Sequence, residues 1–225
     1  MSICLTQLNT DEVLRYMGCP PEEADNALRA AVEAGARSLL RTARPRWTYR
    51  VFDLEFEPGG VRLVGGMLLP GEDLKGHLAG CSRAAVFCAT LGAETDLLIR
   101  RAEPRDVLEL LILDSCGTAA AEDLCDQAEQ ELHAMFPGCH FPFRYSPGYG
   151  DLPLSVQGEL LHLLDAPRRV GLTATSSHIL IPRKSVTAIL GVSDAPVPSH
   201  IRSCLACPGY LSCQYRKSGG HCGIS

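Results

Sequence analysis

Residues 144–153 read Arg-Tyr-Ser-Pro-Gly-Tyr-Gly-Asp-Leu-Pro. Two prolines in this short stretch exclude a helix and a central strand, because proline lacks the backbone N–H that both structures use. Pro147-Gly148 is typical of a tight turn, since the proline ring fixes φ and the following glycine can take a positive φ. The stretch therefore predicts a stiff loop. Its candidate binding residues are Arg144, which can pair with a carboxylate, and Tyr149, which has a flat face and a polar tip.

The order Arg144-x-x-x-Gly148-Tyr149 resembles the S-adenosylmethionine-binding motif of the activation (reactivation) domain of vitamin B12-dependent methionine synthase. Residues 175–188, Thr-Ser-Ser-His-Ile-Leu-Ile-Pro-Arg-Lys-Ser-Val-Thr-Ala, are similar to the segment of this family in which a proline precedes a Ser-Val-Ser or Ser-Val-Thr strand. The two motifs occur in the family's order. The resemblance implies an α+β fold with a curved, mostly antiparallel sheet, packed helices and a ligand in a shallow groove.

The same resemblance implies which residues bind S-adenosylmethionine. Arg144 would take the ligand's carboxylate, backbone groups from Ser146 to Gly148 would read the adenine, and Tyr149 would pack beside the ligand. Asp114 aligns with an acidic position near the family's ligand site, and a helix-breaking surface aspartate explains it equally well.

An acid must also take the ligand's ammonium group. Four acidic residues are candidates, and the sequence does not decide among them: Asp11, Glu12, Asp53 and Glu55.

The second motif carries the residues expected to face a corrinoid or its carrier protein, namely His178, Pro182, Lys184 and Ser185. This stretch faces the cobalamin-binding module in methionine synthases, and here it is more basic than in the relatives. A basic segment suits the amide and phosphate periphery of a corrin or an acidic partner. A solvated strand end is the alternative interpretation.

The end of the chain departs from the family's pattern. Cys204-x2-Cys207-x5-Cys213-x8-Cys222 places four thiols in a short segment that follows a linker with Pro196 and Pro198. Such spacing predicts a metal site. It favours a [4Fe–4S] cluster over zinc, because a closed zinc site is usually built from two paired Cys-x-x-Cys arms. A thiol redox pair is a further alternative.

We therefore predict two units, an activation-domain-like body over residues 1–195 and a Cys-rich metal-binding tail over 196–225. The other seven of the eleven cysteines are scattered and odd in number, which argues against a disulfide framework and favours small core residues.

Composition sets the remaining expectations. The 225 residues are 46% hydrophobic and 21% charged, as in ordinary soluble domains. A net charge of −5 argues against a nucleic-acid surface. No apolar run is long enough to span a membrane, and the first residues lack the pattern of a signal peptide, so a cytoplasmic protein is expected.

Hydrophobic periodicity predicts both helices and strands. The expected helices cover 11–17, 21–45, a segment from Leu97 that Pro104 interrupts, and 105–135, with another after Ser155. The expected strands cover 47–56, 61–69, 84–90, 170–175 and 180–192.

The resemblance implies a stand-alone reactivation module that binds S-adenosylmethionine and supports reductive methylation of cob(II)alamin. No cobalamin-binding Asp-x-His-x-x-Gly motif occurs, so the cobalamin is expected on a partner, a methionine synthase that lacks its own activation domain. Flavodoxin or ferredoxin is the expected electron donor. Whether the chain is itself an enzyme stays open, because it would act only together with its partner.

One alternative is a non-catalytic adaptor that docks a corrinoid protein and has a structural zinc tail. An ordinary methyltransferase is disfavoured, because no glycine-rich loop follows a first strand.

Overall fold

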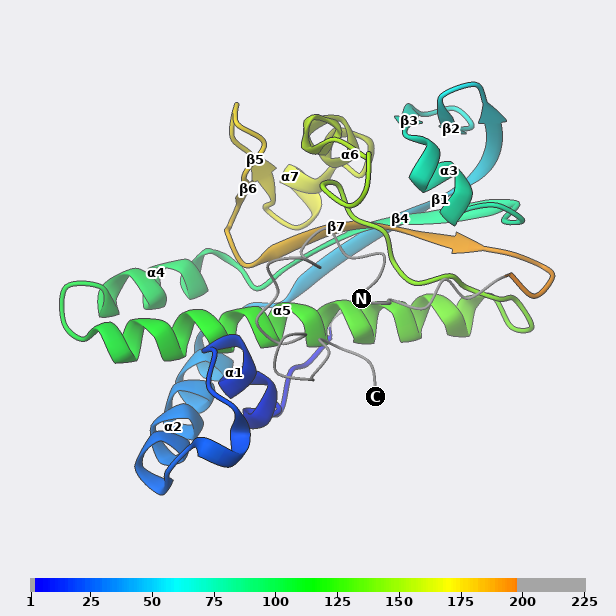
Figure 1. The fold of residues 1–225 in the computed structure, drawn as a ribbon. Helices are drawn as coiled ribbons and strands as arrows, with labels where there is room; N and C mark the ends of the chain where they lie inside the picture. Colours follow the sequence, from blue (N-terminus) through cyan, green and yellow to red (C-terminus); the bar gives the residue numbers. More distant parts are fainter. Residues whose placement is uncertain (1–2, 198–225) are drawn as a thin grey trace.

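The structure is a computed structural model that describes residues 3–197. Its centre is a five-stranded sheet with the order β3-β2-β1-β4-β7, in which every neighbouring pair is antiparallel. The strands are β1 (Arg46–Glu57), β2 (Gly60–Leu63), β3 (Leu68–Pro70), β4 (Arg83–Thr90) and β7 (Ser185–Val192). The predicted α+β fold with a curved antiparallel sheet is confirmed (Figure 1).

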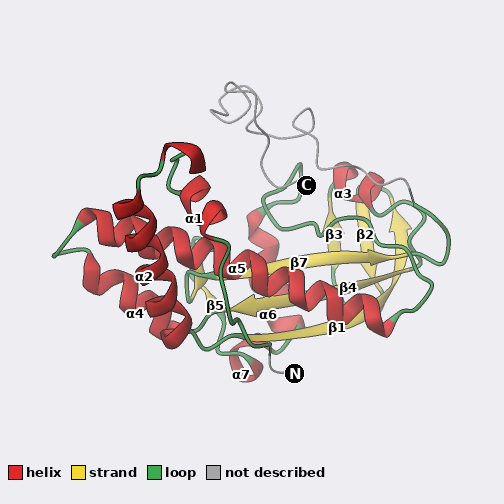
Figure 2. Ribbon diagram, turned by 90° about the horizontal axis from the view of Figure 1, so that it is seen from below, coloured by secondary structure: helices red, strands yellow, loops and turns green. Residues whose placement is uncertain are grey.

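Helices cover both faces of this sheet (Figure 1). The long helix α5 (Val107–Met135) crosses one face, with α1 (Thr10–Tyr16), α2 (Asn26–Thr42) and α4 (Ala93–Ala102) packed against it, as the view in Figure 2 also shows. The other face carries α3 (Glu72–His77), α6 (Gln157–Leu163), α7 (Ala166–Arg169) and the small hairpin of β5 (Thr173–Ala174) and β6 (Leu180–Ile181).

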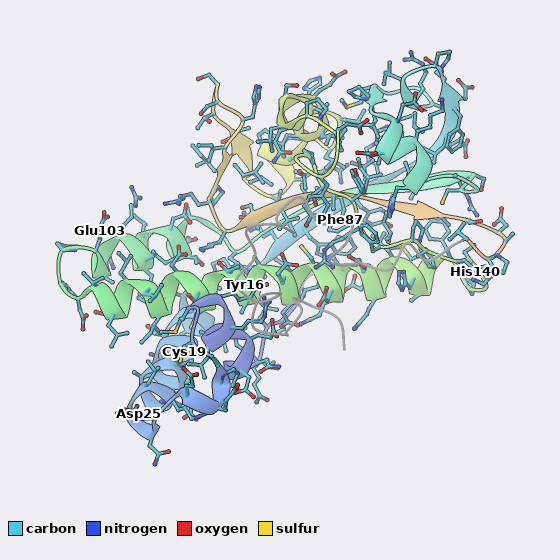
Figure 3. The ribbon with its side chains drawn as sticks, viewed as in Figure 1. Tyr16, Cys19, Asp25, Phe87, Glu103 and His140 are labelled. Carbon is cyan, nitrogen blue, oxygen red and sulfur yellow. The ribbon has the colours of Figure 1, made fainter. Side chains whose placement is uncertain are left out.

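Strand β4 shows why two cores form. Its side chains alternate between the faces of the sheet. Ala85, Phe87 and Ala89 belong to the core beneath α5, whereas Ala84 and Val86 belong to the core on the opposite face. Phe87, labelled in Figure 3, is fully buried. The continuous apolar run of β4 therefore follows from its burial on both sides.

Several predicted elements have different bounds. The helix predicted over 21–45 is a short 3-10 turn, Pro21–Glu23, followed by α2, because Asp25 caps α2 by accepting a hydrogen bond from the Leu28 N–H at 2.7 Å. The single strand predicted over 61–69 is two strands, β2 and β3, separated by a turn with Gly65 at φ +72°.

The strand predicted over 180–192 is likewise divided, into β6 and β7. Of the strand predicted over 170–175, only Thr173–Ala174 is extended and paired.

The prediction that the scattered cysteines are small core residues holds for some of them, whereas Cys4 is exposed and Cys19 and Cys139 are half-buried. All seven are free, and four of them are buried: Cys81, Cys88, Cys116 and Cys125. Burial raises the pKa of the Cys88 and Cys116 thiols to about 12, so both stay protonated at neutral pH. No helix among the described residues is long and apolar enough to cross a membrane.

Candidate functional site

The loop 144–153 starts at the edge of the sheet. The Tyr145 N–H donates to the Ile189 carbonyl at 2.9 Å, and the Ile189 N–H donates back at 2.8 Å. His140 and Ser193 make a second antiparallel bridge, near the end of α5 where Figure 3 labels His140. The chain before the loop therefore runs alongside β7, which fixes the direction in which its side chains point.

The predicted tight turn is confirmed. The Tyr149 N–H donates to the Ser146 carbonyl at 3.0 Å across Pro147-Gly148, and Gly148 has φ +95°. A proline followed by a positive-φ glycine is the pattern of a type II turn. The Gly148 N–H then donates to the Leu152 carbonyl at 2.8 Å, which closes the loop on itself.

Helix α3 holds the far end of the loop. Gly71 at the start of α3 provides no side-chain cap, and the Asp151 carboxylate accepts from the N–H groups of Glu72 at 2.7 Å and Asp73 at 3.2 Å instead. A carboxylate suits the positive end of a helix. A Cβ at Gly150 would lie 2.3 Å from the Tyr145 hydroxyl, so a side chain has no room there. The loop is thus pinned between β7 and α3.

Arg144 is buried against α5, with 7% of its side chain exposed. Its Nη1 donates to Asp126 at 2.6 Å and to Glu129, and its Nη2 donates to Glu122. Burial alone would lower the pKa of Arg144, but Glu129 and Asp126 outweigh that effect and raise it. Three carboxylates around one guanidinium leave the cluster with excess negative charge.

The three carboxylates are the residues that sequence reasoning missed. Glu122, Asp126 and Glu129 follow one another at steps of four and three residues, which places them on one face of α5. This spacing is the feature of the sequence from which an acidic face of the helix could have been predicted. We call these three residues and Arg144 the Arg144 cluster.

Tyr149 lies in different surroundings. It is 44% exposed, and its ring meets the ring of Tyr145 edge-on at 5.7 Å. Tyr145 belongs to the core on the face opposite α5 and packs 4.9 Å from His77. The structure thus places Arg144 and Tyr149 in one loop but on different sides of the chain.

Two hollows of the described surface contain no residue of this loop. One lies between α6, α7 and β5 and includes His162 and Asp165, and the other lies beside α3 and includes Phe56 and Lys75.

Asp114 and Lys184, predicted for two different roles, form an ion pair at 2.9 Å. Lys184 Nζ also donates to the Thr118 hydroxyl at 2.9 Å, and its stem covers Gly117, where a Cβ would meet it at 2.9 Å. Asp114 precedes Glu122 by eight residues, which is about 12 Å along a helix. Asp114 is therefore separate from the Arg144 cluster and holds the segment before β7 onto α5.

Replacing Lys184 by methionine is expected to lower the free energy of unfolding by about 1–2 kcal/mol, because the change removes two hydrogen bonds of a charged, mostly buried group. Urea denaturation measures this effect. Lys75→Met, which removes an exposed pair with Glu72 at 3.6 Å, is the control and should change stability by less than about 0.5 kcal/mol. Equal losses in the two variants would contradict a holding role for Lys184.

The other residues of the second motif lie near this contact. Ser185 Oγ donates to the Pro182 carbonyl at 2.7 Å and lies 2.7 Å from the Thr90 hydroxyl, so it supports the backbone. Pro182 is buried. His178 sits half-buried in the turn between β5 and β6, with φ +65°.

Of the four candidate acids for the ammonium group, two lie on α1, which packs against α5. Asp11 pairs with Arg29 at 3.2 Å, and Glu12 pairs with Arg15. Tyr16 lies where α1 meets α5 (Figure 3), and its pKa is raised first by burial and then by Glu122 of the Arg144 cluster. Asp53 and Glu55 are instead on β1, opposite Arg83 of β4 and Arg62 of β2.

The predicted metal ligands Cys204, Cys207, Cys213 and Cys222 lie outside the described residues. Of the unit predicted for 196–225, only residues 196 and 197 are described. Within residues 3–197, no group of three or more His, Cys, Asp or Glu is placed to hold a metal ion.

The comparisons with known proteins agree with the fold. No family model matches the sequence, and no curated protein matches it either. Among solved structures, the MetH reactivation domain bound to AdoHcy superposes with a TM-score of 0.65 at 14% identity, covering 95% of this chain and 82% of that one. The chain therefore has the fold of the reactivation domain of methionine synthase, as the two sequence motifs predicted.

Proposed function

We propose that the chain is a stand-alone reactivation module that binds S-adenosylmethionine and supports reductive methylation of cobalamin carried by a partner protein. The observation that carries the proposal is the likeness of nearly the whole chain to a reactivation domain bound to AdoHcy, the demethylated product of that methyl donor. The Arg-x-x-x-Gly-Tyr loop, with its turn and its anchors on β7 and α3, adds independent support.

The loop and the Arg144 cluster supply groups that suit this ligand. Arg144 is buried and donates three of its five guanidinium N–H groups to carboxylates of α5, so it would take the ligand's carboxylate with the other two only after the cluster opens. The excess negative charge of the cluster suits the ammonium and sulfonium groups. Tyr149, on the other side of the chain from Arg144, is exposed and would offer a face for packing, with the backbone groups from Ser146 to Gly148 in the turn beside it.

The partner would be a methionine synthase without its own activation domain. When its cobalt is oxidised to Co(II), one electron and the methyl group of S-adenosylmethionine restore methylcobalamin and release S-adenosylhomocysteine. The electron would come from a donor such as flavodoxin or ferredoxin. The segment from His178 to Ser185, which Lys184 ties to α5, is the side we assign to the corrinoid. Cys204, Cys207, Cys213 and Cys222 would hold a [4Fe–4S] cluster or zinc.

Titration calorimetry with S-adenosylmethionine and S-adenosylhomocysteine tests the ligand. We expect stoichiometric binding of both, weakened about tenfold in Tyr149→Ala, because the packing of an aromatic ring contributes about 1–1.5 kcal/mol. Phe56→Ala is the matched control, since Phe56 is an aromatic residue that is also 44% exposed but lies on β1, and it should bind normally.

The absence of binding to the wild-type chain would overturn the proposal in favour of an adaptor that only docks a corrinoid protein. Reductive methylation of a cobalamin-loaded methionine synthase, with and without the chain, then tests the partner.

A further inference from the structure

A mostly apolar groove of about 430 Å³ lies beside α3, and no residue of the loop 144–153 lines it. Its lining includes Phe56 from β1 together with Lys75, Gly76, Ala79 and Gly80 from α3 and the residues after it. Phe56 is 44% exposed, which is unusual for an aromatic side chain without a polar tip. The groove therefore leaves apolar surface in contact with water, and covering it would be favourable.

The described chain ends beside this groove. A Cβ built at Gly80 would lie 3.4 Å from Cγ1 of Val197, the last described residue. Twenty-eight residues follow, 198–225, and they include the apolar residues Ile201, Leu205 and Leu211. An extended chain covers about 3.3–3.6 Å per residue, so Ile201 and Leu205 can reach any point along α3, which is only about 9 Å long.

The charges of the two parts are complementary. Three of the 21 basic residues but none of the 26 acidic residues lie beyond Val197: Arg202, Arg216 and Lys217. The tail is therefore cationic and the body acidic. Glu72 and Lys75 both line the groove and pair with each other at 3.6 Å. The acidic charge near the groove therefore comes from Asp73 and Asp151 at the adjoining end of α3, where Asp151 accepts from the N–H groups of Glu72 and Asp73.

From these observations we propose that the C-terminal segment docks into the groove beside α3, with Ile201 and Leu205 covering Phe56, Gly76 and Ala79. Docking would hold Cys204 and Cys207 next to α3, whose first turn is capped by Asp151 of the loop 144–153. The thiols would then lie beside the helix that anchors the loop. The proposal does not depend on the methyl-donor function, because it concerns only the chain's own tail and groove.

Gly76 and Gly158 make a matched pair for the test. Each lies in a helix, each is exposed, and a Cβ at either position would meet nothing within 4 Å. Gly76→Trp fills the groove beside α3, whereas Gly158→Trp places the same side chain on α6. The readout is the rate at which trypsin cleaves the full chain after Arg202, followed by mass spectrometry. We expect cleavage at least tenfold faster in Gly76→Trp and unchanged in Gly158→Trp.

Equal cleavage rates in the wild type and both variants would overturn the proposal. A metal that alone protected the tail would give this result, because its protection would not depend on the groove. Protection that disappears on dilution would also overturn it, because the occupant would then be a second copy. As a second measurement, the Ile201→Asp/Leu205→Asp variant should show faster hydrogen exchange in residues 74–80 than the wild type. Unchanged exchange there would mean that the tail does not cover α3.

Discussion

Replacing Arg144 by alanine is expected to lower the free energy of unfolding by about 3 kcal/mol. The change leaves Glu122, Asp126 and Glu129 facing one another without the cation that now lies among them. Removing one partner of a buried ion pair typically costs about 3–5 kcal/mol, and the lower end applies because the Asp126 side chain is 60% exposed. Urea denaturation followed by circular dichroism measures the loss.

Arg62→Ala is the matched control for this prediction. Arg62 also pairs with a carboxylate, Glu57, but both groups are accessible to solvent, which screens the pair, so the loss should be much smaller than in Arg144→Ala. The Arg144→Ala/Glu129→Gln variant should recover part of the stability, since it removes one of the three like charges. An Arg144→Ala protein as stable as Arg62→Ala would contradict the view that this cluster fastens the loop to α5.

Arg144→Lys separates the structural role from the ligand role. Lysine keeps the charge but lacks the planar fork of donors, so the variant should retain much of the stability and still bind S-adenosylmethionine poorly. Calorimetry measures the binding. If this variant bound the ligand normally, Arg144 would not be a ligand-binding residue, and the stability prediction for Arg144→Ala would be unaffected.

Local rules predicted much of the fold. The turn at Pro147-Gly148, the buried strand β4 and the long helix α5 each follow from the residues in a short window, and the structure has all three. The bounds of α2 required knowing that Asp25 caps the helix at the Leu28 N–H in preference to Pro21 opening it. Helix α2 also packs against α5, a contact that no short window contains.

The candidate site was harder to predict because its contacts are distant in sequence. Arg144 meets Glu122 and Lys184 meets Asp114 only when α5 lies across the sheet. The sequence analysis identified Arg144 but not Glu122, and it identified both Lys184 and Asp114 but gave them unrelated roles. An arginine motif indicates a charge, whereas the partners of that charge follow from the tertiary fold.

Gly150→Ala is expected to disturb the same loop from its other end. The added Cβ would lie 2.3 Å from the Tyr145 hydroxyl and 2.6 Å from Oδ2 of Asp73. Asp73 is exposed and can move, but the Tyr145 ring is buried and cannot rotate away. Gly150 also has φ +48°, a region that alanine adopts at a cost of about 1 kcal/mol. The backbone strain and the clash together are expected to lower the free energy of unfolding by about 2–3 kcal/mol.

Gly158→Ala makes the same chemical change in a place where the opposite result is expected. A Cβ at Gly158 meets nothing within 4 Å, and the residue lies in α6, so alanine should raise stability by about 0.5–1 kcal/mol. Because Tyr149 packs on Tyr145, displacing Tyr145 should also weaken S-adenosylmethionine binding at least tenfold in Gly150→Ala and leave it unchanged in Gly158→Ala. If Gly150→Ala lost stability but bound the ligand normally, the Tyr149 side of the loop would not be part of the ligand site.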